Sequence, residues 1–178
     1  MKKVLSIWLF VFIPAALLGQ TNDKTISLLE WLTKRDHIDY VKAKSNAAVF
    51  YDKNALIKQT LITDSDKTIP NISIKDLLSQ AEIRIYNTAP IMLMQTDWRK
   101  KFARLKVKFV TDKASVKFIN SHTVYTFSEP VFLNKESTRV IIGESFICGP
   151  GCGRDDLLLC ELKNGSWQML ARAVIAND

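Results

Sequence analysis

The sequence predicts an α+β fold in which N-terminal helices pack on a C-terminal antiparallel β-meander. Helical signals occur in the first half of the chain, where capping residues precede apolar runs. Strand signals occur from residue 104 onward, where apolar and charged residues alternate. Helices that come first and strands that come later are typical of the α+β class.

The composition indicates one folded domain at residues 20–178. Apolar residues make up 47% of the 178-residue chain, and charges of both signs occur. This composition excludes a disordered chain, which would carry fewer apolar residues and a larger net charge. We find no internal repeat, low-complexity tract or linker that would divide the domain.

Residues 1–19 have the order of a secretory signal peptide. Lys2 and Lys3 give a positive start, and an apolar run follows at residues 4–18. The run is shorter than the ~20 residues that a membrane span needs. No cysteine follows Gly19, the expected cleavage position, so no lipid anchor is expected there. We expect export to the periplasm or the extracellular medium, with no transmembrane span after cleavage; an uncleaved anchor is the alternative.

Two helices are predicted, at residues 27–35 and 73–83. Ser27 and Glu30 have the spacing of a capping box, as do Ser73 and Asp76. Residues 47–62 fit either a strand, a turn and a helix, or two strands, because periodicity does not resolve short apolar runs.

Strands are predicted at 104–111, 115–119, 122–127, 138–148, 156–163 and 166–175. The last two form a hairpin, because Asn164-Gly165 is the strongest sequence signal for a two-residue type I′ turn. That turn sets the expected register and places Cys160 in the core. The expected partners are Lys163 with Ser166, Leu162 with Trp167, Cys160 with Met169, and Leu158 with Ala171.

Three motifs lie in the region from Trp98 to the C-terminus. They are Ser128 with Pro130-Val131-Phe132, the turn with Cys148-Gly149 and Cys152-Gly153, and Lys163 with Asn164-Gly165 and Trp167. Together they resemble a loose family of small exported bacterial proteins without an assigned activity. The resemblance implies a shared C-terminal sheet and supplies no catalytic residue. It departs at residues 154–156, where Arg-Asp-Asp replaces the small residues expected.

The catalytic and metal-binding options in the sequence are few. His37 and His122 are the only histidines, and neither lies near a nucleophile motif. Three cysteines and two distant histidines make a poor zinc set, and no phosphate-binding loop or dinucleotide motif occurs. We therefore expect no metal and no cofactor, and we assign no catalytic residue.

Glu144 is the one carboxylate whose predicted position is unusual. If the preceding strand closes a loop at residues 149–155, Glu144 falls opposite Cys160 and faces the core. In that position it would be a pocket carboxylate with a raised pKa. A bulge or a slip at the turn would instead send Glu144 to solvent.

Basic residues cluster on both sides of Trp98 and Phe102, which have the spacing of neighbours on one helical face. Such a patch in an exported protein suits an anionic glycan, a lipid headgroup or an acidic protein. Nucleic acid is not expected as a partner. An ordinary solvated surface is the alternative. The candidate residues are Arg99, Lys100, Lys101, Arg104, Lys106 and Lys108.

The turn with Cys148 and Cys152 predicts a structural disulfide, with Cys160 left reduced. The leading functional hypothesis is an exported, non-catalytic binding or interaction domain at the cell envelope or outside the cell, with an unknown ligand. One alternative is a thiol–disulfide protein that uses Cys148 and Cys152. Another is a hydrolase whose site is not visible in the sequence.

Overall fold

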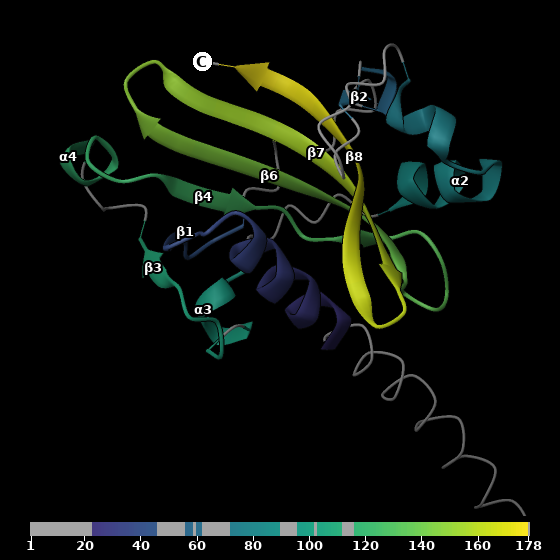
Figure 1. Cartoon of the computed structure of the whole chain (residues 1–178), viewed down its shortest axis with the longest axis horizontal. Helices are drawn as coiled ribbons and strands as arrows, with labels where there is room; N and C mark the ends of the chain where they lie inside the picture. Colours follow the sequence, from purple (N-terminus) through teal and green to yellow (C-terminus); the bar gives the residue numbers. More distant parts are fainter. Residues whose placement is uncertain are drawn as a thin grey trace, which may run out of the picture.

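The computed structural model describes residues 23–45, 56–58, 60–61, 72–89, 96–101, 103–111 and 116–177 (Figure 1). Helices and a mixed sheet occur in these residues, so the α+β class is confirmed. The predicted signal peptide at residues 1–19 lies outside the described residues, as does most of the ambiguous segment 47–62.

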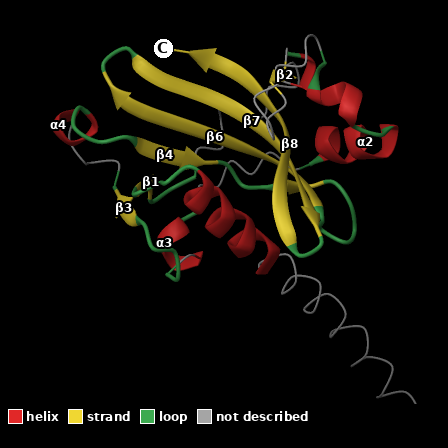
Figure 2. Cartoon of the chain, in the orientation of Figure 1, coloured by secondary structure: helices red, strands yellow, loops and turns green. Residues whose placement is uncertain are grey.

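The described strands form one eight-stranded sheet with the order β2-β8-β7-β6-β4-β1-β3, and β5 also pairs with β6 (Figure 2). Strands β6, β7 and β8 follow one another and pair antiparallel. The short β1 lies between β3 and β4 and runs parallel to both. The strands are β1 Tyr40–Lys42, β2 Thr60–Leu61, β3 Lys108–Val110, β4 Val124–Phe127, β5 Val131–Phe132, β6 Arg139–Gly149, β7 Cys152–Lys163 and β8 Ser166–Asn177.

The turn between β7 and β8 confirms the predicted hairpin. Asn164 and Gly165 both have positive φ, at 52° and 79°, as a type I′ turn requires. The register next to the turn is also as predicted, with Leu162 opposite Trp167 and Cys160 opposite Met169.

Further from the turn, the predicted hairpin register is wrong. The register shifts between Leu159 and Cys160, so that Leu159 lies opposite Ala171 and Leu158 lies opposite Arg172. A β-bulge of this kind places one extra residue in a strand and exchanges the faces beyond it. The bulge therefore brings Arg172 to the face of the sheet that carries Leu158.

Two predicted strands differ from the structure. Residues 116–119 form the short helix α4 (Val116–Ile119), and only the end of segment 104–111 is a strand. Residues 104–107 form a turn and bend that precede β3, and Leu105 and Val107 pack against a buried apolar cluster. Alternation did not separate these short segments from strands, because four or five residues also fit one turn of helix.

The N-terminal helix covers residues 23–35, so the prediction that Ser27 caps its start is wrong. The Ser27 hydroxyl donates to the carbonyl of Lys24 at 2.9 Å and accepts from Trp167 Nε1 at 3.0 Å. Ser27 therefore joins the helix to β8. No helix in the described part of the chain is long and apolar enough to cross a membrane.

The helix predicted at residues 73–83 is divided into two helices. Ser73 and Asp76 form the predicted capping box, but that helix is a 3-10 turn at Ile74–Leu77. A second capping box, Ser79 with Glu82, begins α2 at Gln80–Thr88. The short helix α3 follows at Trp98–Lys101.

Buried side chains pack on both faces of the sheet. The N-terminal helix contributes Leu28, Leu29 and Leu32 to a cluster with Leu158. Ile74 and Leu78 belong to a second cluster with Leu157 and Leu159. Neighbouring residues of a strand point to opposite faces, so the two sets of helices lie on opposite faces. N-terminal helices therefore pack on both faces of the sheet.

Candidate functional site

The six basic residues predicted to form one patch do not share one environment in the structure. Arg99 donates to Asp97 at 3.0 and 2.7 Å, and this bonding holds the pKa of Asp97 at about 2. Lys108 lies over the Tyr40 ring, with its Nζ 5.4 Å from the ring centroid. Arg104 and Lys106 line a groove, Lys100 is exposed, and the Lys101 side chain lies outside the described atoms.

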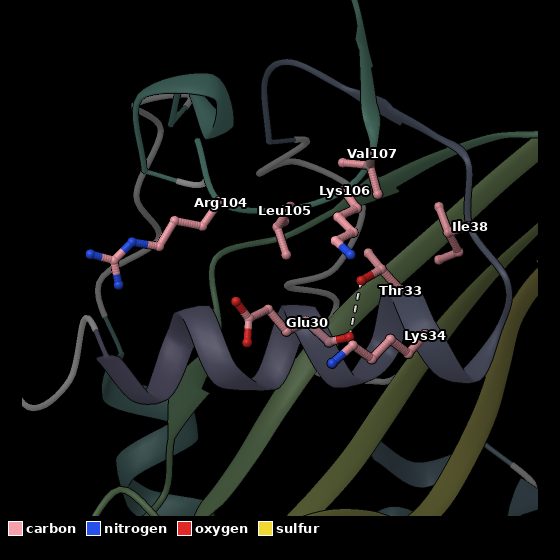
Figure 3. A pocket seen from close by; sticks show the side chains of 8 residues that line it. All are labelled: Glu30, Thr33, Lys34, Ile38, Arg104, Leu105, Lys106 and Val107. Carbon is pink, nitrogen blue, oxygen red and sulfur yellow. Dashed lines mark hydrogen bonds between the residues drawn. The ribbon is translucent and has the colours of Figure 1, made fainter.

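The groove lies between the N-terminal helix and residues 104–107, with a cavity volume of about 250 Å³ (Figure 3). The helix side presents Glu30, Thr33 and Lys34, and Lys106 reaches toward it from the opposite segment. The lining therefore contains three cationic residues and one carboxylate, and the Arg104 side chain extends away from the other lining side chains (Figure 3). The complete lining is Glu30, Thr33, Lys34, Ile38, Arg104, Leu105, Lys106 and Val107.

The groove has fixed apolar walls. Ile38 is buried, and Leu105 and Val107 pack against the same core cluster. The Thr33 hydroxyl donates to the carbonyls of Leu29 and Glu30, at 2.9 and 3.1 Å. The polar contacts that the groove offers to a ligand therefore come mainly from its charged side chains.

A second feature is a cluster of charged side chains buried on the sheet. Glu144 on β6 lies directly opposite Asp156 on β7. Their exposed fractions are 2% and 0%. Arg172 reaches both carboxylates from β8, and Arg35 reaches Glu144 from the end of the N-terminal helix.

The carboxylates of the cluster are paired unequally. Both Nε and Nη2 of Arg154 lie 2.9 Å from Asp156 Oδ2. Glu144 has only longer contacts, 3.6 Å from Oε2 to Arg35 Nη2 and 3.7 Å from Oε1 to Arg172 Nη2. Glu144 Oε2 and Asp156 Oδ1 accept no hydrogen bond from the described residues.

This environment favours the neutral form of Glu144. Burial raises the pKa of Glu144 to about 7, and the negative charges of Asp36 and Asp156 add to the shift. Arg35 and Arg172 oppose it. Burial also raises the pKa of Asp156, whereas the positive charges of Arg172 and Arg154 lower it. Buried carboxyls of this kind hold protons that an exposed carboxyl would release.

The structure places Glu144 opposite Asp156, so the register that paired it with Cys160 is wrong. The β6–β7 turn is tighter than expected, because Gly149 already pairs with Cys152. Glu144 faces the buried side in spite of this difference. No local sequence pattern indicated its partners Arg35 and Arg172, since the first lies on a distant helix and the position of the second depends on the bulge. A correct prediction of the turn length would have identified Asp156 as the residue opposite Glu144.

Cys148 and Cys152 form a disulfide across the β6–β7 turn, with their Cα atoms 5.2 Å apart. Gly149 and Gly151 have positive φ, at 134° and 65°, where a side chain would strain the backbone. Cys160 is free and fully buried, and burial raises the pKa of its thiol to about 12. The disulfide therefore joins two strand ends, away from a helix N-terminus that would activate a thiolate.

When the unreduced protein is denatured and then treated with a thiol reagent, only Cys160 should be labelled. Replacing Cys148 and Cys152 together with serine should lower the free energy of unfolding by about 2 kcal/mol, because the closed loop is short. Denaturant titration measures this change. For the labelling experiment, the control is a reduced sample, in which all three cysteines should be labelled. Three labelled cysteines in the unreduced protein would contradict the assignment.

The two histidines lie in separate places. His122 stacks on Phe118 with ring centroids 4.3 Å apart, and Tyr40 meets its edge at 4.8 Å. His37 is exposed with a φ of 51°, in the turn after the N-terminal helix. Among the described residues, no group of three or more His, Cys, Asp or Glu side chains could hold a metal ion.

Comparison with protein-family models, with curated proteins and with solved structures found no match. The groove and the charged cluster are therefore the features of the structure that bear on function.

Proposed function

We propose that the protein is an exported, non-catalytic binding domain that takes an anionic ligand in the groove between the N-terminal helix and residues 104–107. The observation that carries the proposal is the combination of three cations with apolar walls in one cavity of about 250 Å³. Export is supported by the N-terminal sequence pattern and by a disulfide, which persists best in oxidising compartments.

The groove favours an anion that also has an apolar part. Lys34, Arg104 and Lys106 would pair with a sulfate, phosphate or carboxylate group. Leu105 and Val107 would contact an apolar chain beside that group. A lipid headgroup with the start of its acyl chain has this chemistry, whereas a purely polar glycan would leave the apolar walls unused.

Neither alternative function has comparable support. A thiol–disulfide protein needs an exposed sulfur with a lowered pKa, but the disulfide joins strand ends and the third thiol is buried. A hydrolase would need a nucleophile beside a base. Burial raises the pKa of Glu144 to about 7, yet this carboxyl is enclosed beneath Arg35 and does not line the groove.

Hexyl sulfate is a suitable probe, because it joins a permanent negative charge to a short apolar chain. We expect it to bind more tightly than inorganic sulfate or hexanol, and binding should weaken with added salt. Replacing Arg104 and Lys106 with alanine should reduce its affinity about two- to thirtyfold, since each charged contact contributes on the order of 0.2–1 kcal/mol at an exposed site. Isothermal titration measures the affinities.

Lys135→Ala/Lys163→Ala is the matched control, because it also removes two positive charges, from exposed positions that do not line the groove. Its affinity for hexyl sulfate should equal that of the native protein. Equal weakening in this control would show that only net charge matters. Unchanged affinity in the Arg104→Ala/Lys106→Ala variant would also reject the groove as the site.

A further inference from the structure

The end of the N-terminal helix covers the buried charged cluster on the sheet. We infer that this helix is held by a proton-dependent latch, in which docking of the helix takes up a proton at Glu144. The inference goes beyond the proposed function and does not require that the groove bind a ligand.

Glu144 is the least compensated member of the cluster. Arg35 is engaged by Asp36, which accepts from its Nε at 2.8 Å and pairs with its Nη2. Arg154 is engaged by Asp156 through two contacts of 2.9 Å. The nearest cations to Glu144 are 3.6 and 3.7 Å away, and its Oε2 accepts no hydrogen bond from the described residues. A proton on Glu144 would remove this poorly balanced charge.

Titratable and charged groups reach or influence Glu144 from every neighbouring element. The cluster contains three arginines and three carboxyl groups, so its net charge is zero when all six are ionised and +1 when Glu144 is protonated. The titratable and charged groups around Glu144 are Arg35 and Asp36 from the end of the helix, Tyr125 from β4, Arg154, Asp156 and Cys160 from β7, and Arg172 from β8.

The direction of the effect follows from burial. With the helix docked, burial raises the pKa of Glu144 to about 7. Lifting the end of the helix would remove Arg35 and Asp36 and admit water, so that the pKa would fall toward that of an ordinary glutamate. The docked form therefore binds the proton more tightly. Docking should strengthen as the pH falls below about 7 and weaken as the pH rises through that value.

Cys160 reports on whether the helix is docked. It is fully buried in the same cluster as Leu28, Leu29 and Leu32 of the helix. It is also the only free cysteine in the protein, because the other two are bonded to each other. A thiol reagent should reach its sulfur only when the helix has moved away.

The test is the rate at which 4,4′-dithiodipyridine modifies Cys160 in the unreduced protein between about pH 5.5 and pH 8. Each rate is divided by that of the denatured chain at the same pH, which removes the titration of the thiol itself. We expect the protection of Cys160 to fall about tenfold or more over this range. In Glu144→Gln, protection should depend little on pH, since the amide cannot titrate.

Glu161→Gln is the control, because Glu161 lies next to Cys160 on β7 but pairs with Gln168 instead of the cluster. It should keep the native pH dependence. The latch is rejected if native protection does not change with pH, or if Glu144→Gln keeps the full change. If Glu144→Gln fails to fold, carbon NMR of the native protein decides, and an ordinary pKa for Glu144 rejects the latch.

Ligand binding in the groove provides a second measurement, and this measurement rests on the proposed function. Glu30, Thr33 and Lys34 line the groove from the same helix that ends at Arg35. Hexyl sulfate should therefore bind more weakly at about pH 8 than at pH 5.5 in the native protein, with a smaller change in Glu144→Gln. No binding at any pH would reject the proposed function alone, while the protection of Cys160 would still decide the latch.

Discussion

Replacing Trp167 with alanine should lower the free energy of unfolding by about 3–5 kcal/mol, the usual cost of removing a large buried aromatic side chain. Trp167 is 5% exposed and packs in the cluster that includes Leu28 and Met169. Its Nε1 also donates to Ser27 Oγ at 3.0 Å. The substitution would leave a cavity between the N-terminal helix and β8, and it would remove a bond that joins them.

Urea denaturation followed by circular dichroism measures this loss. Trp167→Phe separates the two contributions, because it keeps an apolar ring and removes only the donor and some volume. We expect Trp167→Phe to cost clearly less than Trp167→Ala. A cost below about 1 kcal/mol for Trp167→Ala, typical of surface substitutions, would contradict the observed packing.

Replacing Arg172 with alanine should cost up to about 3–5 kcal/mol at neutral pH, because it removes the cation that Glu144 and Asp156 share and leaves them only Arg35 and Arg154. Arg172 Nε lies 3.4 Å from Asp156 Oδ2, and its Nη2 lies 3.7 Å from Glu144 Oε1. The side chain of Arg172 is 17% exposed and that of Asp156 is fully buried. Water would therefore replace the lost interaction only in part.

The cost of Arg172→Ala should depend on pH. The pKa values of Glu144 and Asp156 are already raised by burial, and loss of a nearby cation would raise them further. Protonation relieves the unpaired charge, so the cost should be smaller at about pH 5.5 than at pH 8. Denaturant titrations at both pH values measure the difference.

Arg84→Ala is the matched control for Arg172→Ala. Arg84 is exposed on α2, and its Nε donates to the carbonyl of Gln80 at 3.4 Å. We expect this variant to change stability by less than about 0.5 kcal/mol at either pH. Equal effects of the two substitutions would show that Arg172 does not stabilise the buried carboxylates.

Several features followed from local sequence signals. Asn164-Gly165 predicted the hairpin turn and the pairing next to it, because both residues tolerate positive φ. The glycines between Cys148 and Cys152 predicted that the two sulfurs could meet across a turn, and they do. The order of helices before strands predicted the α+β class. The turn and the disulfide each depend on residues that are close together in the chain.

The charged cluster depended on contacts that local patterns do not specify. The bulge between Leu159 and Cys160 moves Arg172 onto the face of Glu144, and the tight turn at residues 149–152 places Glu144 opposite Asp156. One residue more or less in either place would reverse which face each later side chain occupies. Alternation reveals a strand but not its bulges.

By itself, the sequence determined the class of fold, the C-terminal hairpin and the cysteine pair, and it left export and a binding function as predictions. The tertiary structure decided which charges meet. It placed the helices on opposite faces of the sheet, brought Arg35 over Glu144, and formed the groove from Lys34 and Lys106, which are far apart in the chain. Turns are set by the conformational preferences of a few neighbouring residues. Burial and charge pairing are set by the packing of distant segments against one another.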